Sequence, residues 1–360
     1  MTMYPLLHRL AEMEPGDEPM LSVYLDMRPH TTGGRPALRD GVLMMGDRLR
    51  EIEKTFGPRG RDLDSFRVDV AHIEEYLRHE FPVSAQGLAI FACAARGLFE
   101  TVEAGVPFEH QVVIGPVPDL FQLARLADDQ ETAVVGVVNF HTIRLFVMRT
   151  GFLREIEGTG DTSVHYRKTM LGGLNQKRYQ RHVENHRAEF AREAAAELER
   201  VVEREGAARV ILAGNETALP PLLDALSPRV SELVHGQIVR VDVRAPRDAV
   251  AREIEPILAQ AEAEDGLSLA DQLVAAVRSG GLGVDGLERT RAALEHGQVD
   301  VLLLDEDAPL GDTNRNELIR LAAGTGADVE VVRGHAVLSE LGGVGALLRY
   351  QHDAPTPAAV

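Results

Sequence analysis

Short runs of apolar residues, each bounded by glycine, proline or charged residues, alternate along this chain with longer amphipathic stretches. Runs such as "AVVGVV", "RVILAG" and "VDVLLL" have the length and aliphatic composition of strands, whereas "FAREAAAELERVV" has helical spacing. A chain of 360 residues is too long for one compact core. The alternation therefore predicts an α/β fold with three domains, each built around a sheet and its covering helices.

The first predicted domain, residues 1–126, is α+β. Leu21, Val23 and Leu25 alternate with Ser22, Tyr24 and Asp26, which indicates a half-buried strand. Two helices follow, one closed by glycine after "EIEKTF" and one in "VDVAHIEEYLRHEF". The runs "AQGLAIFACAA" and "HQVVIGPVP" are then expected to be strands.

The second predicted domain, residues 127–255, is a mixed sheet with a long helix. Three apolar runs between residues 131 and 160 predict an antiparallel meander. A helix is expected from about Arg178 to Glu205, because Phe190, Ala194, Leu198 and Val201 form a buried stripe. Further strands are expected in "ARVILAG" and "QIVRVDV", with a helix in "ALPPLLDAL" between them.

The third predicted domain, residues 256–360, is an α/β sandwich. The stretch "APRDAVAREIEPILAQAEAED" is expected to be helical before it, and "SLADQLVAAVRSG" to form a separate helix within it. Another helix is expected in "GVDGLERTRAALEHG", with Val284, Leu287 and Leu294 facing one way. Strands in "VDVLLLDED", "ADVEVV" and "GGVGALLRY" complete the alternation.

Composition excludes several classes of protein. Cys93 is the only cysteine and lies in an apolar run, so we expect a small buried residue rather than a disulfide or zinc cluster, and a reducing, cytoplasmic location. The N-terminus lacks the basic start of a signal peptide. No apolar run approaches the roughly 20 residues that span a bilayer, so we expect no membrane partner.

The charge distribution points to one local binding surface. The chain has 56 acidic and 38 basic residues and a net charge of −18, which argues against general coating of nucleic acid. Between His165 and Arg187 the sign reverses, with Glu184 as the single acid. The basic residues of this segment are Arg167, Lys168, Lys177, Arg178, Arg181 and Arg187. A basic island on an acidic body suits the binding of one anionic partner at one place.

Three motifs carry little chemistry. "GLGVDG" satisfies the dinucleotide-binding spacing, but a helical pattern precedes it where a strand is required, so we expect a turn between helices. His182 and His186 lie four residues apart, but Glu184 is one place too late for the zinc-protease motif. The acids of "DEDA" could hold magnesium but are commonly only solvated. We therefore expect no cofactor and no metal.

The segment "GGLNQKRYQR" has two alternative interpretations. Adjacent glycines allow positive φ and leave no Cβ to obstruct a ligand, and basic and amide residues follow them. It could be a mobile surface loop between the meander and the long helix. It could instead be a flexible finger that enters a crowded anionic site.

The same segment resembles the glycine loop of the archaeal and eukaryotic class-1 release factors. The positions that match are Gly172, Gly173, Arg178, Tyr179 and Arg181. Downstream, "GVDGLERTRAALEHGQVDVLLLDED" and "ELGGVGALLRY" are similar to the third domain of that superfamily, which includes Pelota. The opening "LSVYLDMRP" and the "GLAIF" strand resemble the bacterial branch, the bacterial archaeo-eukaryotic release-factor-like proteins. The similarity to domains two and three covers roughly residues 130–352.

The resemblance implies a ribosome-associated protein. Gly172 and Gly173 would allow the loop into the peptidyl-transferase centre, where peptidyl-tRNA would be hydrolysed during rescue of stalled ribosomes. Ribosomal RNA would be bound by Lys177, Arg178, Arg181, Arg167 and Lys168. The third domain would contact a translational GTPase.

Two departures from the family pattern keep the activity open. Leu174 stands where the family has its catalytic glutamine. Leucine still offers a backbone N–H, but only Asn175 or Gln176 could orient water, and Gln176 is the candidate. The N-terminal segment also lacks the stop-codon-reading motif. Either the chain is a peptidyl-tRNA ester hydrolase, or it is a non-catalytic hibernation factor that blocks the A site. A small-molecule α/β enzyme would rest on "GLGVDG" alone.

Overall fold

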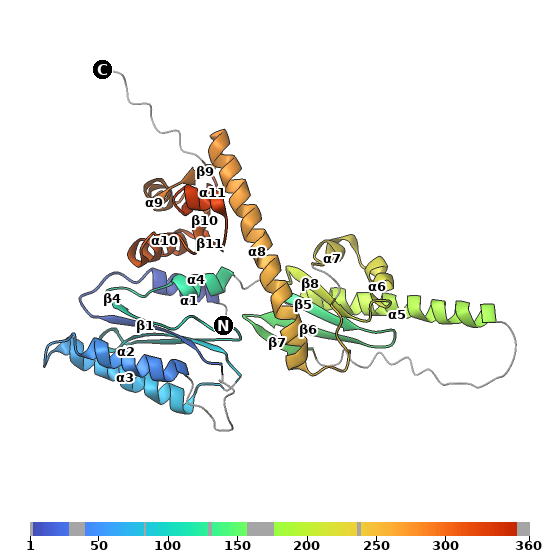
Figure 1. The fold of residues 1–360 in the computed structure, drawn as a ribbon, viewed down its shortest axis with the longest axis horizontal. Coiled ribbons are helices and arrows are strands. Elements are labelled where there is room, and N and C mark those ends of the chain that lie inside the picture. Colours follow the sequence, from blue (N-terminus) through green and yellow to red (C-terminus); the bar gives the residue numbers. More distant parts are fainter. Residues whose placement is uncertain are drawn as a thin grey trace, which may run out of the picture. The chain divides into compact units, whose positions relative to one another are not determined.

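The computed structural model describes residues 3–28, 40–82, 84–128, 132–156, 176–235 and 239–350. The chain divides into two compact units (Figure 1). One unit comprises Met1–Asp129 together with Ala263–Val360, and the other comprises Gln130–Glu262. The central part of the sequence is therefore inserted between two halves of one unit.

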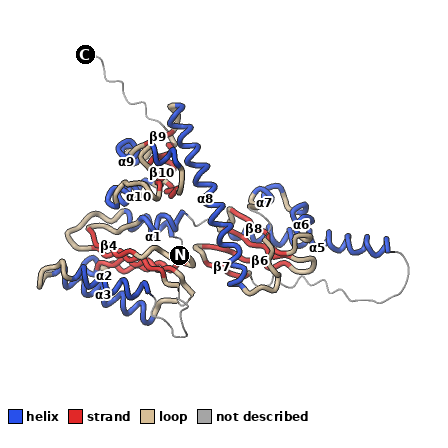
Figure 2. Tube along the Cα trace, viewed as in Figure 1, coloured by secondary structure: helices blue, strands red, loops and turns tan. Residues whose placement is uncertain are grey.

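The N-terminal half of the first unit is built on a four-stranded antiparallel sheet. Its strands lie in the order β3-β2-β1-β4. The elements are α1 (Met3–Ala11), β1 (Met20–Asp26), α2 (Asp40–Glu53), α3 (Arg61–His79), β2 (Gly87–Cys93), the 3-10 turn η1 (Ala94–Arg96), β3 (Leu98–Ala104), β4 (Gln111–Gly115) and α4 (Phe121–Asp128). Figure 2 shows α2 and α3 together on one side of this sheet. The predicted strands and both predicted helices are present, whereas β3, α1 and α4 were not expected from the sequence.

The expected half-buried strand is wrong in one respect, because β1 is buried on both faces. Leu21, Val23 and Leu25 pack with residues of α2 and α3. On the opposite face, Tyr24 is fully buried and its hydroxyl donates a hydrogen bond to the carbonyl of Asp119 at 2.6 Å. Residues of α1 and α4 cover that face, so the polar positions Ser22 and Tyr24 of the alternation are buried too.

The C-terminal half of the first unit has a second four-stranded sheet, in the order β11-β10-β12-β9. Strands β10 and β11 are parallel and the other pairs are antiparallel. The elements are β9 (Gly283–Asp285), α9 (Leu287–Glu295), β10 (Val299–Asp305), α10 (Asp312–Thr325), β11 (Asp328–Val332), α11 (Ala336–Glu340) and β12 (Val344–Leu348). The expected strands are present. Val284 was expected on a helix and lies instead in β9, where it pairs with Ala346 of β12.

One hydrophobic core joins the two halves of this unit. Residues of α1 and α4 pack in the same cluster as residues of α10 and β10. The side chain of Asn316 donates to the carbonyl of Pro118 at 2.8 Å and accepts from the amide of Leu120 at 2.9 Å. The guanidinium of Arg320 donates to the carbonyls of Ala11 and Met13. The N-terminal and C-terminal halves of this unit, although their contacting residues lie about two hundred positions or more apart in the sequence, therefore fold together.

The central unit has a mixed sheet in the order β7-β6-β5-β8. Its elements are β5 (Ala133–Val138), β6 (Ile143–Arg149), β7 (Phe152–Glu155), α5 (Gln176–Glu205), β8 (Arg209–Gly214), α6 (Leu219–Ala225) and α7 (Pro228–Glu232). Strands β5 to β7 form the expected antiparallel meander, and β8 is parallel to β5. The expected stripe of α5 is buried against one face of the sheet. The strand expected in "QIVRVDV" is wrong for the described residues from 239 onward, where a single bridge joins Val239 to Ala213.

A single helix, α8 (Arg247–Ser279), replaces the two helical stretches that the sequence suggested. Val250, Ile254 and Leu258 of its first half cover the other face of the central sheet. Ala270 and Leu273 of its second half pack with Leu303 and Leu338 of the first unit. The expected boundary at residues 255 and 256 falls inside this helix, and the three-domain division 1–126, 127–255 and 256–360 stays a prediction. The mixed α/β class with three sheets is confirmed.

Candidate functional site

The predicted site residues lie within residues 167–181 of the sequence, in and before the first turns of α5. Gly172, Gly173, Arg167 and Lys168 lie outside the described residues. The other four lie on the first turns of α5, where the structure describes the helix but not the side chains: Gln176, Lys177, Arg178 and Arg181. Their roles in catalysis and RNA binding stay predictions.

The last described strand before the Gly-Gly segment, β7, has a defined direction in the central sheet. Strand β7 is antiparallel to β6, which is antiparallel to β5, so β7 and β5 run in the same direction. Glu155 pairs with Phe146, and Phe146 pairs with Val135. Strand β7 therefore runs towards the edge formed by the carboxyl ends of β5 and β8, and it ends level with the middle of β5.

Helix α5 extends beyond this edge. Its 30 residues span about 45 Å, whereas the six residues of β5 span about 20 Å. Among the side chains of α5 that are described, from His186 onward, the first buried one is Phe190. One turn before it, the guanidinium of Arg187 lies 3.9 Å from the centroid of the Phe140 ring, in the turn after β5. Eleven residues of helix precede Arg187, and Figure 1 shows α5 continuing past the sheet.

An ion pair fixes the end of β7. Arg144 on β6 donates from Nε and Nη2 to the two carboxylate oxygens of Glu155, at 2.7 and 2.8 Å. Its Nη1 donates to the carbonyls of Val243 and Ala245, both at 2.7 Å. The hydrogen bonds from Arg144 hold the pKa of Glu155 below its usual value, and those to Glu155 raise the pKa of Arg144. Both groups thus stay charged at neutral pH.

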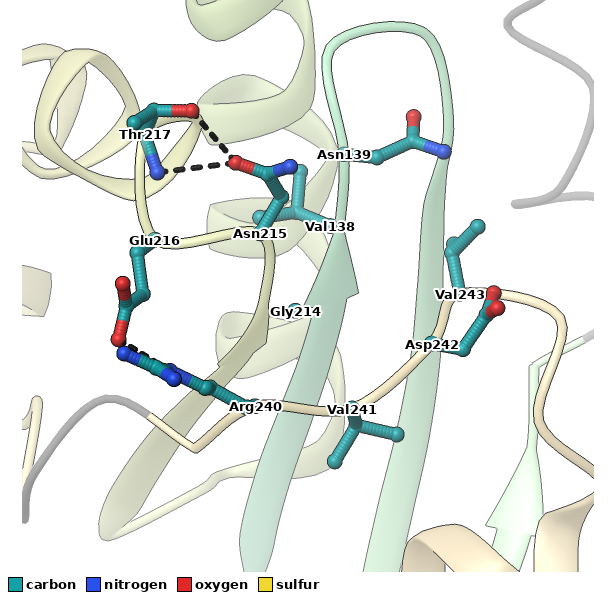
Figure 3. Close-up of a pocket in the computed structure, with 10 residues that line it drawn as sticks. All are labelled: Val138, Asn139, Gly214, Asn215, Glu216, Thr217, Arg240, Val241, Asp242 and Val243. Carbon is teal, nitrogen blue, oxygen red and sulfur yellow. Dashed lines mark hydrogen bonds and ion pairs between the residues drawn. The ribbon is translucent and has the colours of Figure 1, made fainter.

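A pocket of about 660 Å³ opens at the carboxyl ends of β5 and β8 (Figure 3). We call it the strand-end pocket. It is lined by Val138, Asn139, Gly214, Asn215, Glu216, Thr217, Arg240, Val241, Asp242 and Val243. Gly214 has a φ of 124°, and a Cβ built there would lie 2.0 Å from the carbonyl oxygen of Val138. Only glycine therefore permits the two strand ends to approach this closely.

Two asparagines frame the strand-end pocket, one after each strand. The side-chain oxygen of Asn139 accepts from the amides of His141 and Thr142, at 2.7 and 2.8 Å. That of Asn215 accepts from the amide and hydroxyl of Thr217, at 2.9 and 2.6 Å (Figure 3). These turns assign oxygen and nitrogen in both amide groups and fix their orientation.

Charged groups complete the rim of the strand-end pocket. Nε of Arg240 donates to Glu216 at 2.5 Å, and both side chains are exposed. One carboxylate oxygen of Asp242 accepts from the amide of Arg244 at 2.8 Å. The sequence analysis missed this pocket. An asparagine directly after each of two apolar strands was the available signal, since asparagine commonly begins a turn there.

Two of the motifs set aside from the sequence, "GLGVDG" and "DEDA", lie among the described residues, and neither forms a catalytic arrangement there. Helix α8 ends at Ser279, before "GLGVDG", and the strand β9 lies inside the motif, so the order required for a dinucleotide site is absent. The side chain of Asp305 is buried and accepts from the hydroxyl of Ser339. Glu306 pairs with Arg333 and Arg125, and the bond from Arg333 holds its pKa below the usual value. These acids are paired rather than merely solvated.

Two further observations concern the described residues alone. Within them, no group of three histidine, cysteine, aspartate or glutamate side chains is placed to hold a metal ion. None of the helices seen in this part of the chain combines the length and the apolar character needed to cross a membrane.

Comparison with known proteins identifies the family that the central segment resembles. Residues 118–259 match the model of bacterial archaeo-eukaryotic release factor family 10. The Pelota homolog of Haloarcula marismortui is 30% identical over 188 residues, which cover 46% of this chain and 53% of that protein. The chain thus spans about half the length of this curated relative.

The comparison with solved structures found the following similarities. Pelota of Archaeoglobus fulgidus is 21% identical, with a TM-score of 0.40, over 77% of this chain and 82% of that one. An archaeal Pelota in a model of the ribosome-bound protein with ABCE1 is 16% identical, with a TM-score of 0.43, over 97% and 94% of the two chains. S. cerevisiae Dom34, a translation termination-like factor that interacts with Hbs1, is 12% identical, with a TM-score of 0.40, over 74% and 81%.

The family model matches the central part of the chain, which includes the meander and α5. The resemblance to the bacterial archaeo-eukaryotic release-factor-like proteins is therefore confirmed, and residues 118–259 carry the match to that family.

Proposed function

We propose that this chain is a ribosome-associated, release-factor-like protein that inserts the segment around Gly172 and Gly173 into the peptidyl-transferase centre. The observation that carries the proposal is the family match over residues 118–259, because this range contains the meander, α5 and the segment between them. The protein would act in the cytoplasm, where its ribosomal substrate is found.

The geometry of α5 supports this reach. The glycines lie directly before the helix in the sequence, and the helix extends by several turns beyond the point where Arg187 contacts Phe140. A segment carried at the end of such a helix can enter a narrow site while the sheet stays outside. Arg187 is exposed, and it adds a positive charge to the same helix.

The proposed reaction is hydrolysis of the peptidyl-tRNA ester during rescue of stalled ribosomes. Gln176 would orient the attacking water, and the backbone N–H of Leu174 would stabilise the developing oxyanion. Ribosomal RNA phosphates would be bound by Lys177, Arg178, Arg181, Arg167 and Lys168. The C-terminal part of the chain would contact a translational GTPase.

A peptide-release assay tests the reaction. Ribosomes that carry labelled peptidyl-tRNA are incubated with the wild-type protein, with Gln176→Ala and with Gln180→Ala as a matched amide control. Release by the wild type and the control, together with its loss in Gln176→Ala, supports the hydrolase. Release that survives in Gln176→Ala removes Gln176 from the mechanism.

The second candidate is a non-catalytic factor that blocks the A site of idle ribosomes. Leu174 favours it, because leucine cannot orient water as the family glutamine does. Tight co-sedimentation with 70S ribosomes without peptide release by any variant would establish this function.

The basic island is tested by the salt dependence of ribosome binding. If the basic island binds phosphates of ribosomal RNA, the affinity for the ribosome decreases steeply as the salt concentration rises. Arg178→Glu is then expected to abolish ribosome binding. Arg200→Glu on the same helix is the charge-matched control, since Arg200 pairs with Glu197 on the helix surface. Binding that does not depend on salt would show that the island is not the contact.

A further inference from the structure

We propose that the strand-end pocket binds a ribonucleotide, through its ribose hydroxyls and its phosphate. The described residues that line the pocket all belong to the central unit. Its volume of about 660 Å³ is within the usual range of small-molecule sites.

Two fixed amide groups supply hydrogen-bond donors. Because the oxygens of Asn139 and Asn215 each accept two bonds from their turns, only their NH₂ groups are left for a ligand. Among the described residues, neither NH₂ group has a protein acceptor within hydrogen-bond distance. Both asparagines line the pocket (Figure 3), so their NH₂ groups are donors for oxygen atoms of a ligand.

Charged groups supply both acceptors and a further donor. The second carboxylate oxygen of Asp242 has no partner among the described residues, and Arg240 keeps both Nη groups because only its Nε is used by Glu216. With one arginine and two acids, the formal charge of the rim is negative, which disfavours a small bare anion. A hydroxyl group satisfies this mixture, because it donates to a carboxylate and accepts from an amide at once.

A ribonucleotide presents those groups together. Its hydroxyls would donate to Asp242 and accept from the asparagine amides, and its phosphate would accept from Arg240. Gly214 lets the carboxyl ends of β5 and β8 lie close together, which brings Asn139 and Asn215 to the same pocket. This inference rests on the proposed function in one respect. The pocket opens at the sheet edge towards which β7 runs, and in the sequence β7 precedes the segment that we propose to contact RNA, which favours an RNA chain as the source of the ligand.

The test compares ligands that differ only in the 2′-hydroxyl. Binding of fluorescein-labelled oligouridylate and of oligodeoxyuridylate of the same length to the full-length protein is measured by fluorescence anisotropy. We expect the RNA to bind about tenfold more tightly, which is the worth of one good hydrogen bond to a charged group. Equal affinity for the two oligomers, or binding of neither, would overturn the proposal.

Substitutions in the pocket test whether its residues cause the preference for RNA over DNA. Asn139→Asp and Asn215→Asp keep the turns and replace donors by an acceptor, so each is expected to remove the preference for RNA. Asp242→Asn keeps an oxygen for the amide of Arg244 and is expected to reduce the preference. Ser231→Asp and Asp224→Asn, exposed positions of the same unit, are the charge-matched controls and should change nothing. A preference for RNA that survives in both Asn→Asp variants contradicts the proposal.

Two further experiments distinguish a free nucleotide from an RNA chain as the ligand, and the strand-end pocket from the basic island as the binding site. Displacement of the RNA by uridine monophosphate at matching affinity identifies a free nucleotide as the ligand, whereas resistance to it identifies an RNA chain. Arg178→Glu is expected to weaken RNA and DNA binding equally and leave their ratio intact. A variant that loses ribosome binding but keeps the ratio of RNA to DNA affinity therefore affects the basic island. A variant that loses this ratio affects the strand-end pocket.

Discussion

Arg144 and Glu155 face each other across β6 and β7 with two parallel hydrogen bonds, of 2.7 and 2.8 Å. The remaining guanidinium nitrogen of Arg144 holds the carbonyls of Val243 and Ala245, in the loop that passes the strand-end pocket. One side chain thus joins the end of β7, from which the chain leaves towards the Gly-Gly segment, to the wall of the pocket. The planar fork of arginine suits this task, and the point charge of lysine does not.

We predict that Arg144→Ala lowers the free energy of unfolding by about 2–4 kcal/mol, because it leaves a carboxylate and two carbonyls without their donor. Arg144→Lys should recover little of the loss. The pKa of Glu155 is lowered by Arg144, so this contribution is present above the ordinary pKa of 4.5 and is lost as pH falls below it. Urea denaturation at neutral and acidic pH measures both effects.

The control for Arg144 is Arg154→Ala. Arg154 pairs with Glu205 at 3.4 Å through an exposed side chain, so its loss should cost less than about 1 kcal/mol. A lysine variant as stable as the wild type would contradict the role assigned to the forked geometry.

Alanine substitutions at Gly214 and Gly206 distinguish the cost of a positive φ from the cost of a steric clash. Both have positive φ, but a Cβ at Gly206 would meet nothing within 4 Å, whereas one at Gly214 would collide with the backbone of Val138. We expect Gly206→Ala to cost about 1 kcal/mol and Gly214→Ala to cost clearly more, on the order of 3 kcal/mol or above. Thermal unfolding of the two variants checks the difference, and equal costs would exclude the contact.

Asp69 predicts a pH dependence of stability. Its carboxylate is buried on α3, with one oxygen unpaired among the described residues, and burial raises its pKa from 3.8 to about 6. A raised pKa stabilises the fold fully below pH 3.8, and this stabilisation is lost as pH rises through 6. Asp69→Asn should therefore raise the free energy of unfolding at pH 8 by up to about 3 kcal/mol and by little at pH 4.

The control for Asp69 is the exposed Glu75→Gln on the same helix, which should change stability by less than about 0.5 kcal/mol. Denaturant titrations between pH 4 and pH 8 give both values. Equal destabilisation by Asp69→Asn at every pH would contradict this prediction. It would mean that the carboxylate stabilises the fold as a hydrogen-bond acceptor, rather than destabilising it through the burial of its charge.

Asn316 predicts that residues 1–128 and 263–350 unfold together. Asn316→Ala removes both hydrogen bonds to the 118–120 segment and should cost about 1–3 kcal/mol. Hydrogen exchange should show this loss in amides of both β1 and β10, since one core joins the two sheets. Asn314→Ala, which removes contacts to Leu310 and Arg291 only, is the local control. A loss confined to one sheet would mean that the halves unfold separately.

The sequence by itself determined the elements whose evidence is local. The apolar runs gave the meander and the strands β8, β10, β11 and β12, and the stripe from Phe190 to Val201 gave the buried face of α5. These could be predicted because hydrophobic periodicity reports which face of an element is buried. The resemblance of the glycine loop and the closing strand was likewise readable from residues at fixed spacing.

Tertiary structure alone decided what depends on distant partners. Tyr24 is buried because α1 and α4 cover the second face of β1, and Val284 is in a strand because Ala346 pairs with it. Asn139 and Asn215 frame one pocket only because β5 and β8 are parallel neighbours. Periodicity describes one segment at a time, whereas burial and site geometry are set by contacts between segments far apart in the chain.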